Sequence, residues 1–313
     1  ADEQFSYGND VLQKVYAWHG RSADNEMYAD KALIFIHGGC WLNAYGYEHA
    51  KGMYQALAEL GMGVYVPEYR RVGDEGGGWP GSLDDVTKAI NTALKRIEKE
   101  GRYTSIFVVG HSAGGHLALL AAQRLSSSSL NLTRTNLKRV IGIGAITDIQ
   151  TDALGHNSCP SAAARFMNGT PEELPGKYQS ATPNPELSTM PITLLQGDAD
   201  NIVPARHAEL IGASKKIIIN GDLKHEFGTI SDQEWRHTLQ LLDFFGKHCR
   251  EIVLIKGNHD AILGPIAKKR NVKVLDYYII EPSIIEKNTL IENRNSIKNK
   301  KSILEKIIIN NKT

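Results

Sequence analysis

Short apolar runs alternate along most of this chain with stretches whose apolar residues recur at helical spacing. The short runs predict strands at residues 11–18, 32–36, 64–66, 106–109, 140–143, 192–196 and 216–219. The helical spacing predicts helices at residues 46–60, 84–97, 117–122 and 233–245. We expect the strand at 11–18 to lie at an edge. Strands that alternate with helices indicate an α/β fold whose mostly parallel sheet has helices on both faces.

Composition narrows the class of protein without naming a partner. The chain has 313 residues, of which 42% are hydrophobic and 23% charged, and its formal net charge is +1. Such a balance argues against a nucleic-acid partner, and no apolar run approaches the roughly 18 residues of a membrane span. We therefore expect a soluble protein. The first residue, Ala1, leaves open a tag, a trimmed chain or a removed signal peptide, and thus export to the periplasm or medium.

Two segments differ from the rest of the chain. Residues 147–183 are rich in Ala, Asn, Ser, Gly and Pro with weak periodicity, and we expect a cap rather than a surface excursion. Residues 251–313 contain 14 Ile and 2 Ala, against 16 Ile and 25 Ala before them. This change of composition predicts a main domain over residues 1–249 and an appendage over residues 250–313.

The stretch from Val108 to Gly115, with the sequence VVGHSAGG, contains the clearest catalytic motif of the chain. It places the pattern G-x-S-x-G between an apolar strand and an apolar helix, which is the context of a nucleophile elbow. Glycines two residues either side of Ser112 leave room for the sharp turn. The N–H of Ala113 then stands at a helix N-terminus, where it favours a developing negative charge. The pattern predicts a nucleophilic Ser112 rather than a structural glycine-rich turn.

A catalytic serine needs a base, and the base needs a carboxylate that orients it. Asp198 and Asp200 follow the strand at 192–196, and His225 follows the next strand. We expect Asp200 to orient His225, because Asp200 is far enough beyond its strand to turn back toward the histidine. Asp198 is expected in a solvated turn, and Glu226, as a sequence neighbour of the histidine, is expected to point away from it.

Four motifs occur in order along the chain. They are His37-Gly38-Gly39-x-Trp41, Gly110-His111-Ser112-Ala113-Gly114-Gly115, Gly197-x-x-Asp200-x-x-Val203-Pro204 and His225-x-Phe227. Together they resemble α/β-hydrolase esterases of the hormone-sensitive-lipase-like and kynurenine-formamidase-like groups, over about residues 6–246. The run Glu68-Tyr69-Arg70-Arg71-Val72-Gly73, followed by Gly77-Gly78-Trp79-Pro80 and Asp84-Asp85, is similar to bacterial members of that clan. The resemblance implies the α/β-hydrolase fold, with Ser112 as nucleophile, His225 as base and Asp200 as its orienter.

The resemblance also implies an oxyanion hole formed by the N–H of Ala113 and that of Gly38 or Gly39. Glycines suit this role, because no Cβ hinders a substrate oxygen. Lipase-type relatives often have a third glycine where this chain has Cys40. We call the loop that carries Gly38 and Gly39 the oxyanion loop. Trp41 is expected either to bind substrate by lining the acyl pocket or to pack under the oxyanion loop.

The remaining histidines and the cysteines carry weaker expectations. His37 and His111 are expected to hold loops by hydrogen bonds, and His116 to be packed or exposed away from the chemistry. Three cysteines are too few for a disulfide scaffold and lack metal-ligand spacing. We expect Cys40 and Cys159 to meet where the oxyanion loop approaches the cap.

The appendage has a motif of its own. The run Ile252-Val253-Leu254-Ile255-Lys256-Gly257-Asn258-His259-Asp260 resembles one block of the calcineurin-like metallophosphoesterases. That family needs further metal ligands, and no histidine follows His259. We expect strands at 252–255 and 272–275, no metal site and no chemistry.

The sequence therefore predicts a serine hydrolase that cleaves small carboxylic esters through an acyl-enzyme, without cofactor or metal. An aryl-formamidase acting on N-formylkynurenine-type amides is the enzymatic alternative. A binding module that keeps the fold without turnover is the alternative from another class. The natural substrate, its acyl length and the oligomeric state stay open.

Overall fold

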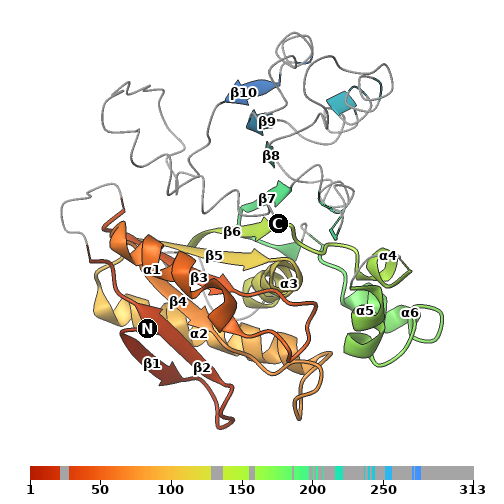
Figure 1. The fold of residues 1–313 in the computed structure, drawn as a ribbon, viewed down its shortest axis with the longest axis horizontal. Helices are drawn as coiled ribbons and strands as arrows, with labels where there is room; N and C mark the ends of the chain where they lie inside the picture. Colours follow the sequence, from red (N-terminus) through yellow and green to blue (C-terminus); the bar gives the residue numbers. More distant parts are fainter. Residues whose placement is uncertain are drawn as a thin grey trace.

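The structure of the chain is a computed structural model that describes residues 1–21, 28–127, 137–154, 159–184, 187–196, 200, 202–203, 207, 216–220, 236, 239, 242–243, 251–255, 270 and 272–275. These residues form one sheet with helices on both faces (Figure 1). Within the same residues, no helix has the length and apolar character needed to cross a membrane.

The sheet has ten strands in the described part of the chain, in the spatial order β1-β2-β4-β3-β5-β6-β7-β8-β9-β10. The strands are β1 (Glu3–Ser6), β2 (Lys14–Trp18), β3 (Lys31–Ile36), β4 (Gly63–Pro67), β5 (Ser105–His111), β6 (Leu137–Ile143), β7 (Ile192–Gln196), β8 (Lys216–Asn220), β9 (Glu251–Ile255) and β10 (Lys273–Leu275). Strand β2 pairs antiparallel with both β1 and β4. Every other pairing, from β4 through to β10, is parallel. The mostly parallel sheet predicted from the sequence is confirmed.

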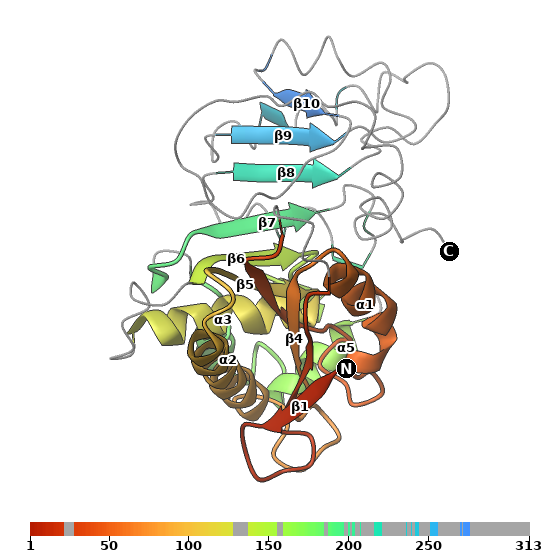
Figure 2. The same cartoon turned by 90° about the vertical axis from the view of Figure 1, so that its left-hand side faces the viewer.

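Helices cover the two faces of the sheet because its central strands are apolar on both sides. The helices are η1 (Tyr47–Ala50), α1 (Lys51–Glu59), α2 (Gly81–Glu100), α3 (Ala113–Ser127), α4 (Ile149–Leu154), α5 (Pro160–Met167) and α6 (Pro175–Ser180). Ile34 of β3 belongs to the core formed with α2 and α3, and Phe35 belongs to the core formed with Tyr54 and Leu57 of α1. Successive strand residues point to opposite faces, so α2 and α3 lie on one side and α1 on the other (Figure 2).

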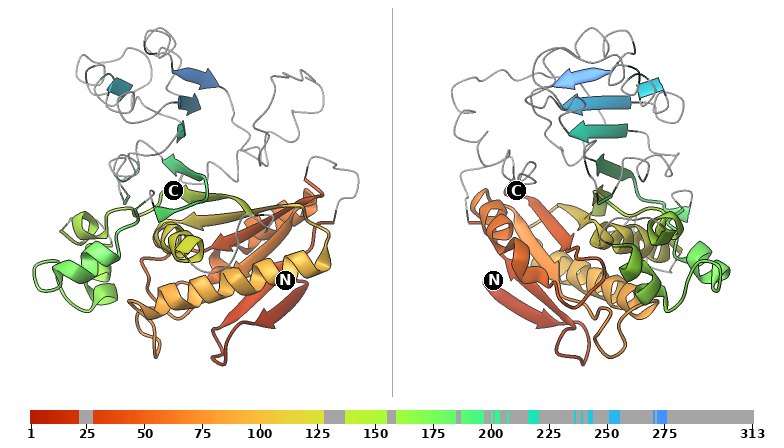
Figure 3. Two further views of the ribbon diagram at one scale, coloured as in Figure 1. Left: turned by 180° about the vertical axis from the view of Figure 1, so that it is seen from behind. Right: turned by 45° about the vertical axis from the view of Figure 1, so that its right-hand side comes forward.

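The segment at 147–183 contains three short helices. Figures 1 and 3 show α4, α5 and α6 grouped at one end of the molecule, beyond the carboxyl end of β5. A disulfide between Cys40 and Cys159 joins this group to the loop that follows β3, with 5.5 Å between the Cα atoms. The expected pairing of these cysteines is confirmed, and a capping role for the segment stays a prediction.

The first residues of the chain fold differently from the expectation. The predicted edge strand at 11–18 begins only at Lys14, because Val11 and Leu12 form a turn. The edge is instead β1, whose partner is β2. Its sequence, EQFS, has a single large apolar residue, Phe5, and is too short to show a strand pattern.

The two strands expected in the appendage are present and continue the same sheet. Strand β9 pairs with β8 over five residues, from Lys216 opposite Glu251 to Asn220 opposite Ile255. Strand β10 pairs with β9. The described positions of the predicted helix at 233–245 are helical, and its Asp243 accepts hydrogen bonds of 2.5 and 2.9 Å from Arg270.

Candidate active site

Ser112 lies at the junction of β5 and α3 in a backbone conformation that non-glycine residues rarely adopt, with φ +53°. Its N–H donates to the carbonyl oxygen of Ile143 at 2.9 Å, and its own carbonyl accepts the His116 N–H at 3.1 Å. The turn is thus attached to β6 on one side and continues as the first turn of α3 on the other. Backbone strain of this kind persists where surrounding structure over-determines it, as at active sites.

Glycines make the turn sterically feasible. A Cβ on Gly110 would lie 2.4 Å from the carbonyl oxygen of Gly114, and one on Gly114 would lie 2.3 Å from the carbonyl oxygens of Ile36 and His37. Both neighbours are backbone atoms, which cannot move aside as a flexible side chain can. Gly110 and Gly114 are therefore required, because backbone atoms at the end of β3 and at the start of α3 leave no room for a Cβ.

The expected oxyanion donors lie on two segments that touch. Ala113 is the first residue of α3, so its N–H has no partner within the helix. A Cβ on Gly38 would lie 3.1 Å from the Ser112 Cβ, so the loop after β3 runs beside the serine. Gly39 has φ +115°, and a Cβ there would lie 2.4 Å from the Cβ of Tyr45. Gly38 thus lies beside the elbow, and Gly39 packs against Tyr45 of its own loop.

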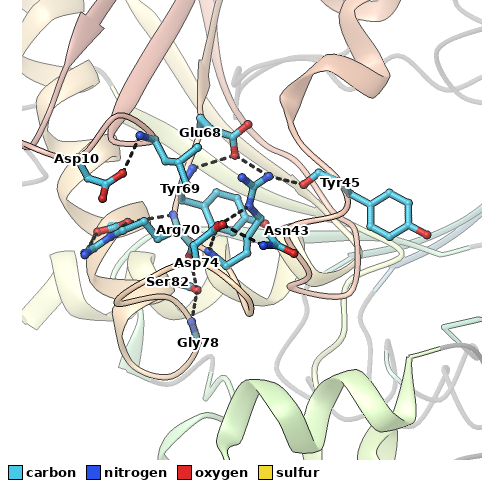
Figure 4. Close-up of polar contacts among 12 residues, drawn as sticks. Asp10, Asn43, Tyr45, Glu68, Tyr69, Arg70, Asp74, Gly78 and Ser82 are labelled. Atoms are coloured by element: carbon cyan, nitrogen blue, oxygen red, sulfur yellow. Dashed lines mark hydrogen bonds and ion pairs between the residues drawn. The ribbon is translucent and has the colours of Figure 1, made fainter.

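The carboxylate of Glu68 anchors this loop through hydrogen bonds and an ion pair. It accepts hydrogen bonds from the His37 Nε2 at 3.0 Å and the Tyr47 N–H at 3.0 Å, and it forms an ion pair of 3.0 Å with Arg71. The Arg71 guanidinium in turn donates to the Tyr45 carbonyl oxygen. Figure 4 labels Glu68 and Tyr45, the two groups that this guanidinium joins. His37, Glu68 and Arg71 are all buried. These bonds hold both ends of the loop from residue 37 to residue 47.

The charge of Glu68 is favoured in this position. Burial alone would raise the pKa of the Glu68 carboxyl, but the hydrogen bond from His37 and the charges of His37 and Arg71 outweigh it and lower the pKa. His37 also stacks on Tyr69, whose hydroxyl donates to the His37 carbonyl oxygen at 2.9 Å. These contacts agree with the structural role expected of His37. Its main partner is Glu68, for which the sequence pattern indicates no role of its own.

A second buried cluster, defined by Trp41, His116 and Phe166, joins this loop to α3 and α5. The indole ring of Trp41 stacks on Phe166 with ring centroids 4.9 Å apart, and its N–H donates to the His116 Nδ1 at 3.3 Å. Trp41 has no exposed surface. These contacts match the alternative in which Trp41 packs under the oxyanion loop. His116 is packed, as one of its two expectations had it.

Asp200 is placed near the elbow by the residues around it. Its Oδ1 accepts the N–H groups of Ile202 and Val203, each at 2.9 Å. A Cβ on Gly144, just after β6, would lie 3.4 Å from its Oδ2. Strand β6 is the neighbour of the strand that leads to Ser112. Asp200 follows β7 and is therefore held beside the end of β6, the strand between its own and the one that leads to Ser112.

Asp200 also acts electrostatically on the residue before the serine. The pKa of the His111 imidazole is lowered by desolvation and by His49, and the negative charge of Asp200 acts in the opposite direction. The predicted base His225, together with Asp198, Asn258 and His259, lies outside the described residues. In the part of the chain that the structure does describe, no group of three or more His, Cys, Asp or Glu residues is arranged to hold a metal ion.

The parallel sheet, the strained serine between strand and helix, and the glycine loop beside it together define an α/β-hydrolase. Comparison with known proteins gives the family. Residues 22–214 match the BD-FAE family, and the chain belongs to it.

Individual relatives are more distant. The chain is 26% identical over 218 residues to esterase LipC of Mycobacterium tuberculosis, covering 64% of this chain and 52% of LipC. It is 34% identical over 129 residues to kynurenine formamidase avaC of Aspergillus versicolor, covering 38% of this chain and 44% of avaC. The chain thus spans about half the length of the curated relatives it matches. The solved structure of esterase B from Lactobacillus rhamnosis has the same fold, with a TM-score of 0.52 at 16% identity, covering 81% of this chain and 73% of that one.

Proposed function

We propose that this protein is a carboxylesterase-type serine hydrolase that cleaves small carboxylic esters through an acyl-enzyme on Ser112. The observation that carries the proposal is the strained position of Ser112, with φ +53°, at the N-terminus of α3 and beside Gly38. A hydroxyl on such a turn stands clear of the sheet, next to backbone donors. The names of the esterase relatives support the same reaction class.

The proposed steps are those of a serine hydrolase. Ser112 attacks the ester carbonyl carbon while His225 takes the hydroxyl proton, and Asp200 orients the imidazole. The negative charge that develops on the carbonyl oxygen is stabilised by the N–H of Ala113 and that of Gly38 or Gly39. His225 then gives its proton to the departing alcohol. Water repeats the sequence on the acyl-enzyme and releases the acid.

A formamidase is the second candidate, favoured by the similarity to kynurenine formamidase avaC. The same serine, base and donors would act on a formyl amide, with an aryl amine as the leaving group. The two candidates differ in substrate rather than in mechanism. A panel of nitrophenyl esters of increasing acyl length, run beside N-formylkynurenine, separates them by kcat/KM.

Labelling by a fluorophosphonate probe tests the nucleophile directly, because only an activated serine reacts quickly. We expect the wild-type protein to be labelled and the Ser112→Ala variant to lose both labelling and turnover, by on the order of 10⁴-fold or more in kcat. Ser180→Ala, at an exposed position on α6, is the matched control and should behave as wild type. A wild-type protein that is folded but neither labelled nor active would indicate the non-catalytic binding module instead.

A further inference from the structure

The proposed oxyanion hole takes its two N–H donors from separate segments of the chain. Ala113 begins α3, whereas Gly38 and Gly39 belong to the loop after β3. Donors of this kind act only when they are held within a fraction of an ångström of the oxygen they stabilise. A contact that fixes the loop relative to the first turn of α3 therefore bears on catalysis without touching substrate.

A side-chain hydrogen bond joins these two segments. The Trp41 Nε1–H, two residues after Gly39, donates to the His116 Nδ1 at 3.3 Å. His116 lies in the first turn of α3, where its own N–H donates to the Ser112 carbonyl oxygen. The bond thus links the oxyanion loop to a residue that is itself hydrogen-bonded to the nucleophile.

The second ring nitrogen of His116 settles the direction of both bonds. His116 Nε2 lies 2.7 Å from the carbonyl oxygen of Ala181, which can only accept. An indole N–H can only donate, so Nδ1 must carry the lone pair and Nε2 the proton. The ring is therefore neutral with a defined tautomer. Burial lowers the pKa of His116 to about 4, with His207 adding to the effect and the Ala181 bond opposing it.

Trp41 is held on its other sides as well. Its ring stacks on Phe166 of α5, and Cys40, the preceding residue, is bonded to Cys159 at the start of the same helix. These contacts fix the indole plane relative to α5. The bond to His116 is the contact that fixes it relative to α3.

We propose that His116 is a positioning residue for the oxyanion hole, which acts by accepting the Trp41 indole N–H and so holding the loop donor in place relative to Ala113. The inference rests on the proposed function, because His116 can position an oxyanion hole only if the reaction forms an oxyanion. It also assigns Trp41 a positioning role rather than contact with substrate.

Two substitutions of His116 separate its two hydrogen bonds. In His116→Asn the amide oxygen takes the place of Nδ1 and keeps the Trp41 bond. In His116→Gln the amide nitrogen reaches the place of Nε2 and keeps the Ala181 bond instead. Each variant loses one buried hydrogen bond, so the losses of thermal stability should be similar. The kcat should differ: close to wild type for Asn, and lower for Gln by about 10- to 100-fold with little change in KM.

Trp41→Phe supplies a second test that does not depend on either amide. It removes the donor while keeping an aromatic ring on Phe166, and it should lower kcat as far as His116→Gln does. Phe166→Leu is the comparison variant: it removes the stack that fixes the indole relative to α5 but leaves the hydrogen bond to α3, so its kcat should fall less than that of Trp41→Phe. The double variant Trp41→Phe with His116→Gln should be no slower than either single variant, because both remove the same bond.

The outcomes are distinct from those for the proposed function. A wild-type protein labelled at Ser112 whose His116→Gln variant keeps kcat, or whose His116→Asn variant loses as much kcat as the Gln variant, overturns the positioning role alone. If both His116 variants fail to fold, a Trp41→Phe variant with wild-type kcat overturns it. An unlabelled, inactive wild-type protein refutes the proposed function and the positioning role together.

Discussion

Replacing Glu68 with glutamine tests the buried cluster that anchors the oxyanion loop. The carboxylate accepts N–H groups on both of its oxygens and forms an ion pair with the buried Arg71. Glutamine keeps the shape, but one oxygen becomes an NH₂ group that faces other donors. The Arg71 guanidinium loses its 3.0 Å ion pair and is left with the longer one, 3.5 Å, to Asp74. Breaking a buried ion pair by neutralising one member destabilises a protein by about 3–5 kcal/mol. We expect Glu68→Gln to lower the free energy of unfolding by this amount at neutral pH.

The pH dependence of the effect has a defined sign. The pKa of Glu68 is lowered below its ordinary value of 4.5, so the folded protein favours the carboxylate more than the unfolded chain does. That stabilisation is complete above the ordinary pKa and is lost as the pH falls through the lower, folded-state pKa. The stability difference between wild type and Glu68→Gln should therefore be constant near neutrality and shrink below pH 4.5.

Urea unfolding followed by tryptophan fluorescence over a pH series measures both quantities. Glu98→Gln, at an exposed position on α2, is the matched control and should change stability by less than about 0.5 kcal/mol. Turnover of a nitrophenyl ester by Glu68→Gln should fall mainly in kcat, because the loop carrying Gly38 and Gly39 loses its anchor. A variant as stable as wild type at neutral pH, or a stability gap independent of pH, would refute this reasoning.

Five further substitutions test the site and the fold that supports it. Gly114→Ala brings a Cβ within 2.3 Å of two carbonyl oxygens at the end of β3 and should destabilise the protein by about 3 kcal/mol in urea unfolding. Gly52→Ala, with nothing within 4 Å, should stabilise it by up to about 1 kcal/mol. Cys159→Ser opens a bridge that spans 119 residues and should lower stability by up to about 5 kcal/mol, with dithiothreitol reproducing the loss in wild type but not in the variant. Asp200→Asn should lower kcat by on the order of 10⁴-fold and Asp198→Asn far less, and the reverse order in ester assays would exchange their roles.

The parts of this fold that sequence could predict are those set by local pattern. The elbow can be predicted because Gly110 and Gly114 flank a serine between two apolar runs. The structure shows the backbone contacts that exclude any larger residue at these two positions. The alternation of strands and helices predicted a parallel sheet for the same reason, since buried strands are apolar on both faces. The strand β1 was missed because Phe5 alone makes no period.

Contacts between distant residues could not be read in this way. Glu68 lies 31 residues from His37, and His116 lies 75 residues from Trp41. Nothing in the spacing of either pair indicates a hydrogen bond, because tertiary packing alone brings them together. Their common signal is chemical: a carboxylate or an imidazole that is buried must find a partner. That rule indicates that a partner exists but not which residue it is.

The appendage adds strands β9 and β10 to the sheet beyond β8. Strand β9 pairs with the whole of β8, and Ile252, Val253 and Leu254 are buried. Each buried aliphatic side chain contributes about 2 kcal/mol before the entropy of ordering the chain is subtracted. Truncation after residue 249 should therefore lower thermal stability and leave β8 as an exposed edge, which favours aggregation.

Turnover should respond differently from stability. Ser112, at the junction of β5 and α3, and Asp200, in the segment after β7, lie outside the appendage. We expect no chemistry from residues 250–313. The kcat per active site, counted by fluorophosphonate titration, should match that of the full chain, and a chelator should change neither protein. A truncated protein that folds and is labelled but does not turn over, or an activity that falls with chelator and returns with Mn²⁺, would assign the appendage a part in catalysis. Counting sites by labelling makes this test independent of the expected loss of stability, since only folded molecules with an activated serine enter the count.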